Sequence, residues 1–252
     1  MRTLFMKTNR IYTPLRKYAW LFVILVAFGG LWFPKLGLLI IPIMLSLAVL
    51  GFAKGKYWCG NFCPHGSLFD FILMPISRFK KIPFSFRHIL MSLLVFSLFM
   101  YILVSRLVDV IGILGTAPFL DQLGLVFVMN YFVVTIIGSV LAVLINPRTW
   151  CYFCPMGTFQ RLFYKLSKIM GLGKRTDLKI SVSNKDLCRS CGKCSKVCPM
   201  QLAPYKEFSD KNQIDNEHCI RCSTCVKNCP VEILYLGTEE EAKGCNLEIS
   251  RK

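Results

Sequence analysis

Twelve of the thirteen cysteines stand at spacings that suit metal ligation. Eight of them form two runs with the same spacing, Cys-x2-Cys-x2-Cys-x3-Cys-Pro: Cys188, Cys191, Cys194 and Cys198, then Cys219, Cys222, Cys225 and Cys229. Three thiolates separated by two residues can hold one face of an iron–sulfur cubane, while the Cys-Pro turn carries the fourth thiolate elsewhere. A zinc site needs only four such ligands. Two complete runs therefore favour iron–sulfur chemistry over zinc.

The two runs have the pattern of bacterial two-cluster ferredoxins, in which the fourth cysteine of each run binds the other cluster. This wiring predicts a first 4Fe-4S cluster on Cys188, Cys191, Cys194 and Cys229, and a second on Cys219, Cys222, Cys225 and Cys198. Two clusters wired in this way lie close together, so electrons can pass between them. We expect the basic residues inside the runs to be solvated surface, with docking of an acidic partner as the alternative: Lys193, Lys196, Arg221 and Lys227.

Four further cysteines occur in two copies of a second motif, Trp58-Cys59-x3-Cys63-Pro64 and Trp150-Cys151-x2-Cys154-Pro155. We call Cys59, Cys63, Cys151 and Cys154 the membrane-exit cysteines, because each pair follows an apolar run. Thiolates three or four positions apart can converge on one metal centre, so the four could form one site for a third iron–sulfur cluster or a single iron. Thiol redox pairs and inert buried thiols are the alternatives, since a reducing cytoplasm disfavours stable disulfides.

Four apolar runs must position these motifs: Tyr18–Phe33, Leu36–Ala53, Ile89–Val104 and Leu123–Ile145. A hydrophobic content of 54% excludes an ordinary soluble domain. The runs approach the ~20 residues that cross a bilayer core, and Pro34 with Gly37 suits a tight turn between the first two. The predicted fold is a membrane all-α domain with four transmembrane helices as two duplicated hairpins. Each hairpin is followed by a cysteine pair and an interfacial helix, at 67–81 and 158–174.

The basic residues lie on one side of these predicted helices. Five lysines and arginines precede the first helix, six lie between the second and third, and the opposite loops carry Lys35 and Arg106. Because positive charge marks cytoplasmic loops, both termini are expected to be cytoplasmic, in a multi-pass protein of the inner (cytoplasmic) membrane. The net charge of +17 is then explained without a nucleic-acid partner.

The predicted domains follow from these signals. Residues 1–174 form the membrane domain with both Cys-Pro motifs, residues 175–237 form an α+β domain of the bacterial 2[4Fe-4S] ferredoxin-like type, and residues 238–252 form a polar tail. Cys245 lies in this tail and is expected to be a free thiol.

Other residues near the motifs are weaker candidates. We expect Ser67 and Thr158 to be helix N-caps and the two motif tryptophans to be interfacial anchors. His65 and His88 could bind a quinone headgroup or carry its protons, although ordinary surface or helix-end histidines explain them as well. The acids Asp109 and Asp121 are expected in the longer extracytoplasmic loop.

The combination of four membrane helices, two cytoplasmic Cys-Pro motifs and a two-cluster ferredoxin domain resembles the NapH/NosR-type membrane 4Fe-4S proteins, also called polyferredoxins. The resemblance covers nearly the whole chain, but the second motif, Cys151-x2-Cys154-Pro155, is one residue shorter than the family's usual spacing. It implies electron transfer between the quinone pool and another redox subunit, such as a multihaem or ferredoxin partner.

Two other function classes remain open at this point. The membrane-exit cysteines could bind and reduce a metal, in a membrane metal (copper) reductase or cofactor-assembly protein. The clusters could also serve a redox sensor that reports to a membrane partner. Quinone-dependent reduction of the clusters separates the electron-transfer hypothesis from both.

Overall fold

The computed structural model describes residues 14–171 and 176–243, so Cys245 lies outside the described residues. The chain divides into two compact units, which we describe separately. The helical unit comprises Pro14–Ala48 and Phe62–Phe159. The C-terminal unit comprises Val49–Asn61 and the described residues from Gln160 onward.

Four helices among the described residues are long and apolar enough to cross a membrane: Pro14–Trp32, Pro34–Lys54, Ile89–Ile111 and Phe119–Leu144. Four membrane helices were predicted from the apolar runs, and this number is confirmed. The third helix is longer than predicted, so Arg106 and Asp109 lie in its last turns and Asp121 lies in the first turn of the fourth. The expectation of a long acidic loop was therefore wrong, because these charged residues extend the helices.

The first two spans are built from several short elements. The first contains α2 (Pro14–Tyr18), α3 (Trp20–Ile24), the π-helix η1 (Leu25–Gly29) and α4 (Gly30–Trp32). The second contains the 3-10 helix η2 (Pro34–Leu39) and α5 (Ile40–Lys54). Phe33 alone separates α4 from η2, so the predicted tight turn is confirmed. Pro34 begins η2, where its fixed φ angle suits the first helical position.

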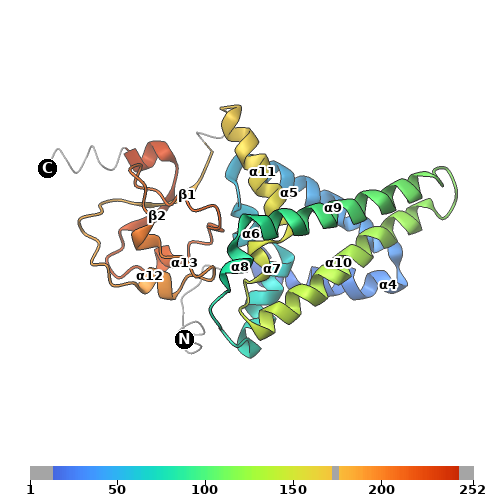
Figure 1. Cartoon of the computed structure of the whole chain (residues 1–252), viewed down its shortest axis with the longest axis horizontal. Helices are drawn as coiled ribbons and strands as arrows, with labels where there is room; N and C mark the ends of the chain where they lie inside the picture. The colour runs from blue at the N-terminus through green and yellow to red at the C-terminus, as the bar shows by residue number, and fades with distance from the viewer. Residues whose placement is uncertain (1–13, 172–175, 244–252) are drawn as a thin grey trace. The chain divides into compact units, whose positions relative to one another are not determined.

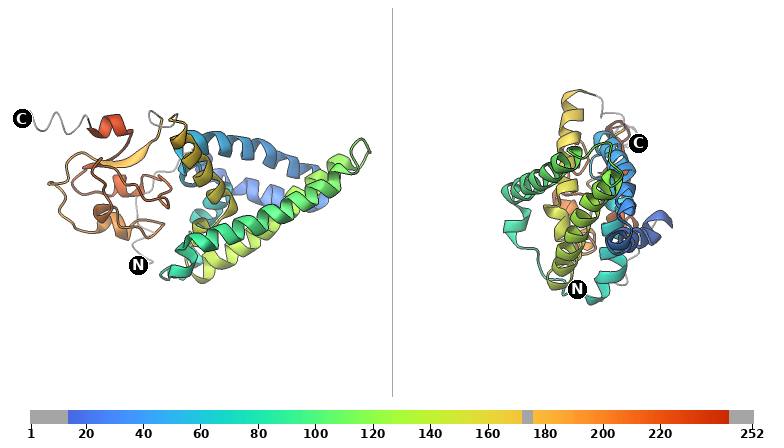
Figure 2. Two further views of the ribbon diagram at one scale, coloured as in Figure 1. Left: turned by 45° about the horizontal axis from the view of Figure 1, so that its top comes forward. Right: turned by 90° about the vertical axis from the view of Figure 1, so that its right-hand side faces the viewer.

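The third and fourth spans are continuous helices, α9 (Ile89–Ile111) and α10 (Phe119–Leu144). The two helices contact each other. In Figure 1 they diverge from the loop that joins them, whereas the left view of Figure 2 shows them next to each other along their length. Helix α10 also contacts η2, where a Cβ atom on Gly37 would lie 2.0 Å from the carbonyl oxygen of Gly124. Small residues at such contacts let the backbones of membrane helices approach closely. Large apolar side chains such as Leu94 and Tyr101 are exposed on α9, as expected for contact with lipid.

Both Cys-Pro motifs begin new helices instead of only ending the preceding ones. Helix α6 (Tyr57–Asn61) and the 3-10 helix η5 (Trp150–Tyr152) carry the first cysteines. Pro64 then begins α7 (Pro64–Leu68), and Pro155 begins α11 (Pro155–Ile169). Ser67 and Thr158 therefore lie inside these helices, and the N-cap prediction was wrong. Cys63 occupies the N-cap position of α7, and its sulfur accepts a hydrogen bond from the Gly66 N–H at 3.4 Å.

The segments after the two motifs differ. Helix α11 is continuous, as expected of an interfacial helix. After the first motif, α7 continues as the π-helix η3 (Phe69–Leu73) and the 3-10 helix η4 (Met74–Ile76), and α8 (Phe84–Arg87) follows before α9. The predicted single helix over 67–81 is therefore wrong, because Pro75 cannot continue the α-helical hydrogen bonds.

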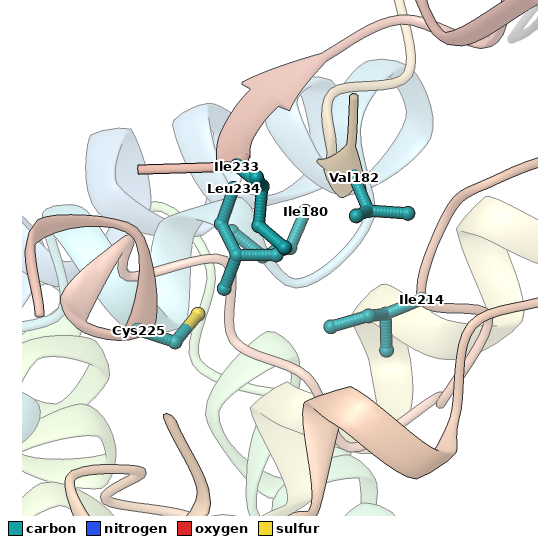
Figure 3. Packing of buried hydrophobic residues seen from close by; sticks show 6 residues of the cluster. All are labelled: Ile180, Val182, Ile214, Cys225, Ile233 and Leu234. Carbon is teal, nitrogen blue, oxygen red and sulfur yellow. The ribbon is translucent and has the colours of Figure 1, made fainter. Parts of the chain in front are cut away.

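The C-terminal unit contains a small antiparallel sheet. Strands β1 (Lys179–Val182) and β2 (Leu234–Gly237) pair with Ile180 opposite Leu236. Between them lie α12 (Lys193–Lys196), the 3-10 helix η6 (Pro204–Lys206) and α13 (Thr224–Lys227). The two strands and the second cysteine run contribute side chains to one buried core. Figure 3 shows its members: Ile180, Val182, Ile214, Cys225, Ile233 and Leu234.

Candidate iron–sulfur centres

Two small cavities in the C-terminal unit are each lined by four cysteines. One is lined by Cys188, Cys191, Cys194 and Cys229. The other is lined by Cys198, Cys219, Cys222 and Cys225. Each cavity therefore combines three cysteines of one run with the fourth cysteine of the other run. Apolar side chains such as Phe208 and Leu202 complete the walls and limit access of water.

The backbone has the same conformation at equivalent positions of the two runs. Ser190 and Arg221, which precede the second cysteine of each run, have positive φ angles of 48° and 54°. Gly192 and Ser223, which follow that cysteine, have positive φ angles of 68° and 55°. Left-handed residues of this kind reverse the chain direction, so each short loop wraps around its cavity. A non-glycine residue in this region is strained, and three of these four positions carry one.

Burial and backbone N–H groups together set the electrostatics of the thiols. Burial raises the pKa of Cys219 to about 11 and raises the pKa values of Cys198 and Cys225 as well. Against this, the Met200 and Leu202 N–H groups donate to Cys198 and lower its pKa. Such donors stabilise negative charge on sulfur, which is the form that binds iron.

This donor set fits a 4Fe-4S cluster in each cavity. Four thiols, an apolar wall and N–H donors to sulfur are the surroundings in which such clusters are held. No three His, Cys, Asp or Glu side chains in the described part of the chain are placed to hold one metal ion. The thiols instead stand around the wall of each cavity, an arrangement that suits a group of several iron atoms.

Three membrane-exit cysteines lie near one another in the helical unit. Cys63 is close enough to Cys151 and Cys154 for their charges to interact. Burial, followed by the charge on Cys151, raises the pKa of Cys63 to about 12. The fourth membrane-exit cysteine, Cys59, belongs to the C-terminal unit, where its sulfur donates to Gln160 Oε1 at 3.1 Å. Gln160 is fully buried, and its Nε2 has no hydrogen-bond partner among the described residues.

A buried cluster of charges, Arg16, Asp70 and Arg148, adjoins the three thiols of the helical unit. Asp70 Oδ2 accepts from Arg148 Nη2 at 2.7 Å and also from Arg16 Nη2, and Asp70 Oδ1 accepts from Arg148 Nε at 3.2 Å. All three side chains are at least 97% buried. Arg148 Nη1 also donates to the sulfur of Cys151 at 3.6 Å. Two arginines share one aspartate, so the cluster has a net charge of +1 beside the thiols.

Gly66 makes room for this arrangement. A Cβ atom at Gly66 would lie 2.7 Å from Arg148 Nη1. The Cys-Pro-x-Gly sequence of the first motif thus provides the N–H donor to Cys63 and also the space for the guanidinium group. The sequence reasoning did not single out Arg148, Asp70 or Gln160. The available signal was an aspartate and an arginine beside apolar membrane segments, where charged residues usually have a functional partner.

Arg221 links four segments of the C-terminal unit. It lies in the second cysteine run, and its guanidinium contacts Asp177 Oδ1 at 2.5 Å and the carbonyl oxygen of Lys54 at the end of α5. It also lies over the ring of Tyr164 in α11, 5.2 Å from the centroid. Arg221 is 6% exposed, so its expected role as solvated surface was wrong. The other three basic residues of the runs are exposed, as expected.

A second close contact lies beside Arg221. A Cβ atom at Gly60 would lie 2.0 Å from the carbonyl oxygen of Ile220. Asn61 Nδ2 donates to the carbonyl oxygen of Arg221 at 3.4 Å. The segment that carries Cys59 therefore packs directly against the loop that carries Cys219 and Cys222.

The remaining candidate residues have ordinary structural surroundings. His65 is half-buried, its Nε2 lies 2.9 Å from Thr135 Oγ1, and its pKa is lowered to about 4 by burial. His88 caps α9 by accepting from the Leu90 N–H, so its helix-end interpretation is confirmed. Trp150 is 6% exposed and packs against Phe153, so the structure places it inside the protein instead of at a lipid interface.

Models of two protein families match the chain. The 4Fe-4S dicluster domain matches residues 180–242, which include both cysteine runs. The 4Fe-4S binding domain matches twice, at residues 36–83 and 127–173. Each of these two segments contains one copy of the Cys-Pro motif and the apolar helix before it. Their match to one model supports a repeat of this part, while duplication of the whole hairpins stays a prediction.

Three relatives share part of this sequence. Uncharacterized protein MJ0749 of Methanocaldococcus jannaschii is 28% identical over 179 residues, which cover 69% of this chain and 61% of that protein. Uncharacterized protein MJ0750 of the same organism is 26% identical over 187 residues, which cover 71% of this chain and 70% of that protein. The methylamine utilization ferredoxin-type protein MauN of Paracoccus denitrificans is 29% identical over 80 residues, which cover 31% of this chain and 25% of MauN.

The match spans less than two thirds of the length of the first of these relatives. No solved structure matches the chain. The two family models and the ferredoxin-type relative nevertheless agree with the geometry of the cysteines. The chain is accordingly an iron–sulfur protein with 4Fe-4S binding domains and four helices that could span a membrane.

Proposed function

We propose that this chain is a membrane-bound electron-transfer subunit that passes electrons between the quinone pool and a redox partner. The observation that carries the proposal is the pair of cavities, each lined by four cysteines in the crossed combination. One cavity would hold a cluster on Cys188, Cys191, Cys194 and Cys229, and the other would hold a cluster on Cys219, Cys222, Cys225 and Cys198. Bound there, 4Fe-4S clusters supply one-electron carriers whose potentials the protein tunes.

The chain's own groups would control these carriers in two ways. The apolar walls exclude water, and the N–H donors to Cys198 and Cys219 stabilise charge on sulfur. Both effects shift the potential of an iron–sulfur cluster. The segment that carries Cys59 follows α5 in the chain and packs against Ile220, which lines the cavity of the second cysteine run. This segment therefore connects that cavity to the end of α5. That connection is the proposed route between the membrane region and the C-terminal clusters.

A third cluster at the membrane-exit cysteines completes the proposal. Cys63, Cys151 and Cys154 lie near one another, and the spacing of the first motif adds Cys59 as the fourth ligand. A thiolate-ligated cluster carries negative charge, and the excess positive charge of Arg148 beside Cys151 would offset it. The unsatisfied Nε2 of buried Gln160, next to Cys59, is a further donor available to sulfur.

The quinone and the partner in this proposal come from the likeness to NapH/NosR-type proteins. The ferredoxin-type name of MauN agrees with an electron-transfer role. The basic segments flanking the four helices favour a cytoplasmic C-terminal unit in the inner membrane. The partner is then a separate redox subunit with haems or iron–sulfur clusters of its own.

Quinone-linked electron transfer tests this function. The anaerobically purified protein would be reduced with dithionite and mixed with a quinone analogue, and the oxidised protein would be mixed with the matching quinol. EPR would follow the clusters in both experiments. We expect electron transfer in at least one direction. If neither quinone nor quinol changes the clusters, the quinone-linked function is wrong.

Two variants place the electron path. Cys63→Ser should abolish quinone-linked turnover if the membrane-exit site lies on the path, while the EPR signals of the C-terminal clusters persist. Cys191→Ser should damage the first C-terminal cluster directly. Unchanged quinone-linked turnover in Cys63→Ser would remove the membrane-exit site from the path.

A further inference from the structure

A third cavity of the C-terminal unit adjoins the cavity of Cys198, Cys219, Cys222 and Cys225, and Ile214, Cys219 and Arg221 line both. The volume of this third cavity is about 310 Å³, and it is lined by the two residues that follow α5, by residues of α11 and by residues between Asp177 and Glu239. Seven of its lining side chains are basic and four are acidic. We call it the basic cavity. Its volume lies at the lower end of the range of small-ligand sites.

The acidic side chains of the basic cavity are already held by neighbouring basic groups. Glu217 pairs with Lys165 at 2.9 Å, and Glu239 pairs with Lys211 at 3.1 Å. Asp177 pairs with Arg221, and Asp215 pairs with Lys179. The lining residues still carry three more positive than negative charges. A concave surface with an excess of one sign of charge attracts ions of the opposite sign.

Part of this positive charge lies in the wall of the cavity, away from water. Lys56 is 4% exposed and Arg161 is 9% exposed. Burial lowers the pKa of Lys168, and the positive charge of Lys179 beside it lowers that pKa further. An anion inside the cavity would relieve this repulsion. Its attraction to the wall is stronger than at an open surface because the local dielectric constant is lower.

We propose that the basic cavity binds an anionic phosphate group. Arginine with several lysines is the usual donor set for phosphate, since the guanidinium offers paired N–H donors and the ammonium groups add charge. Lys56 lies two residues beyond the candidate spanning helix that ends at Lys54, and Arg161 and Lys168 lie on α11. An anionic phospholipid headgroup and a soluble phosphate compound therefore share the required chemistry. This inference goes beyond electron transfer, and its test needs no redox measurement.

Ligand binding by the purified full-length protein in detergent provides the test. The probes are inorganic phosphate, short-chain phosphatidylglycerol and short-chain phosphatidylcholine, whose choline group cancels the charge of its phosphate. The variants are Lys168→Gln and Arg161→Gln, and the matched control is Lys206→Gln. Lys206 is an exposed lysine of the same unit that does not line the cavity. Isothermal titration calorimetry would give each dissociation constant.

The wild-type protein should bind at least one anionic probe more tightly than phosphatidylcholine. Each cavity variant should weaken that binding about fivefold, the effect of one basic side chain on an anionic lipid surface, while Lys206→Gln leaves it unchanged. Lys168 is exposed, so its variant tests the cavity even if Arg161→Gln disturbs folding. Binding of phosphatidylglycerol alone identifies a lipid headgroup, and binding of inorganic phosphate identifies the phosphate group itself. Binding that is absent, or that Lys206→Gln weakens as much as Lys168→Gln, overturns the proposal.

Discussion

Neutralising Asp70 should strongly destabilise the helical unit. The Asp70 carboxylate accepts hydrogen bonds from both Arg16 and Arg148, and the two guanidinium groups are 3% and 1% exposed. In Asp70→Asn the carboxylate charge disappears, and the new NH₂ group cannot accept from either arginine. Removing one partner of a buried ion pair costs about 3–5 kcal/mol, because the remaining charge stays buried without compensation. For a chain of this size, such a loss lowers the melting temperature by roughly 6–20 °C.

The chain provides a matched control for this substitution. Asp121 also faces a basic residue, Lys35, at 3.8 Å, but both side chains are exposed. Because exposed ion pairs contribute only about 0–1 kcal/mol, Asp121→Asn should leave the melting temperature nearly unchanged. Thermal unfolding in detergent, followed by circular dichroism, would compare the two variants with the wild type. Equal losses of stability in the two variants would refute the assigned importance of the buried charges.

The other predictions concern the C-terminal unit and the clusters. Gly60→Ala should lower the free energy of unfolding by about 1–3 kcal/mol, because its Cβ atom would overlap the carbonyl oxygen of Ile220. The loss should be visible as faster proteolysis of the C-terminal unit. Gly29→Ala is the control, since its Cβ atom would make an ordinary contact with Leu36 at 3.4 Å. Burial and a carboxylate partner raise the pKa of Tyr164 above 10.0, so only the unfolded chain loses this proton above pH 10. The free energy of unfolding should therefore fall as the pH rises past that value, and denaturant titrations should find no such slope from this group in Tyr164→Phe. Cys191→Ser should lose about four iron atoms per chain, and an iron content equal to that of the wild type would contradict its role as a ligand. Cys63→Ser should retain both C-terminal clusters.

The features that sequence reasoning predicted are those with local signals. An apolar run of sufficient length predicts a membrane helix wherever it packs, so the four helices were found, with errors of several residues at their ends. The two cysteine runs were recognised from spacing alone, and the structure brings those cysteines to two cavities. The tight turn before Pro34 was predicted from a proline, whose effect is also local.

The features that were missed depend on contacts between distant residues. Asp70 lies 54 residues from Arg16 and 78 from Arg148, so no short motif joins them. Arg221 was expected at the surface together with the three lysines of the runs, but residues from α5, α11 and the segment before β1 bury it. The helix caps were misplaced for a local reason. Serine and threonine are frequent N-cap residues, but proline is favoured at the first helical position. Pro64 and Pro155 accordingly begin α7 and α11.

The iron and acid-labile sulfide content of the anaerobically purified protein tests the central claim most directly. We expect about eight of each per chain for the two C-terminal clusters, or about twelve if the membrane-exit cysteines hold a third 4Fe-4S cluster. EPR of the reduced protein should show interacting 4Fe-4S clusters. A protein that contains zinc, or that binds iron without sulfide, would contradict the claim that its cysteine-lined cavities carry electrons on iron–sulfur clusters.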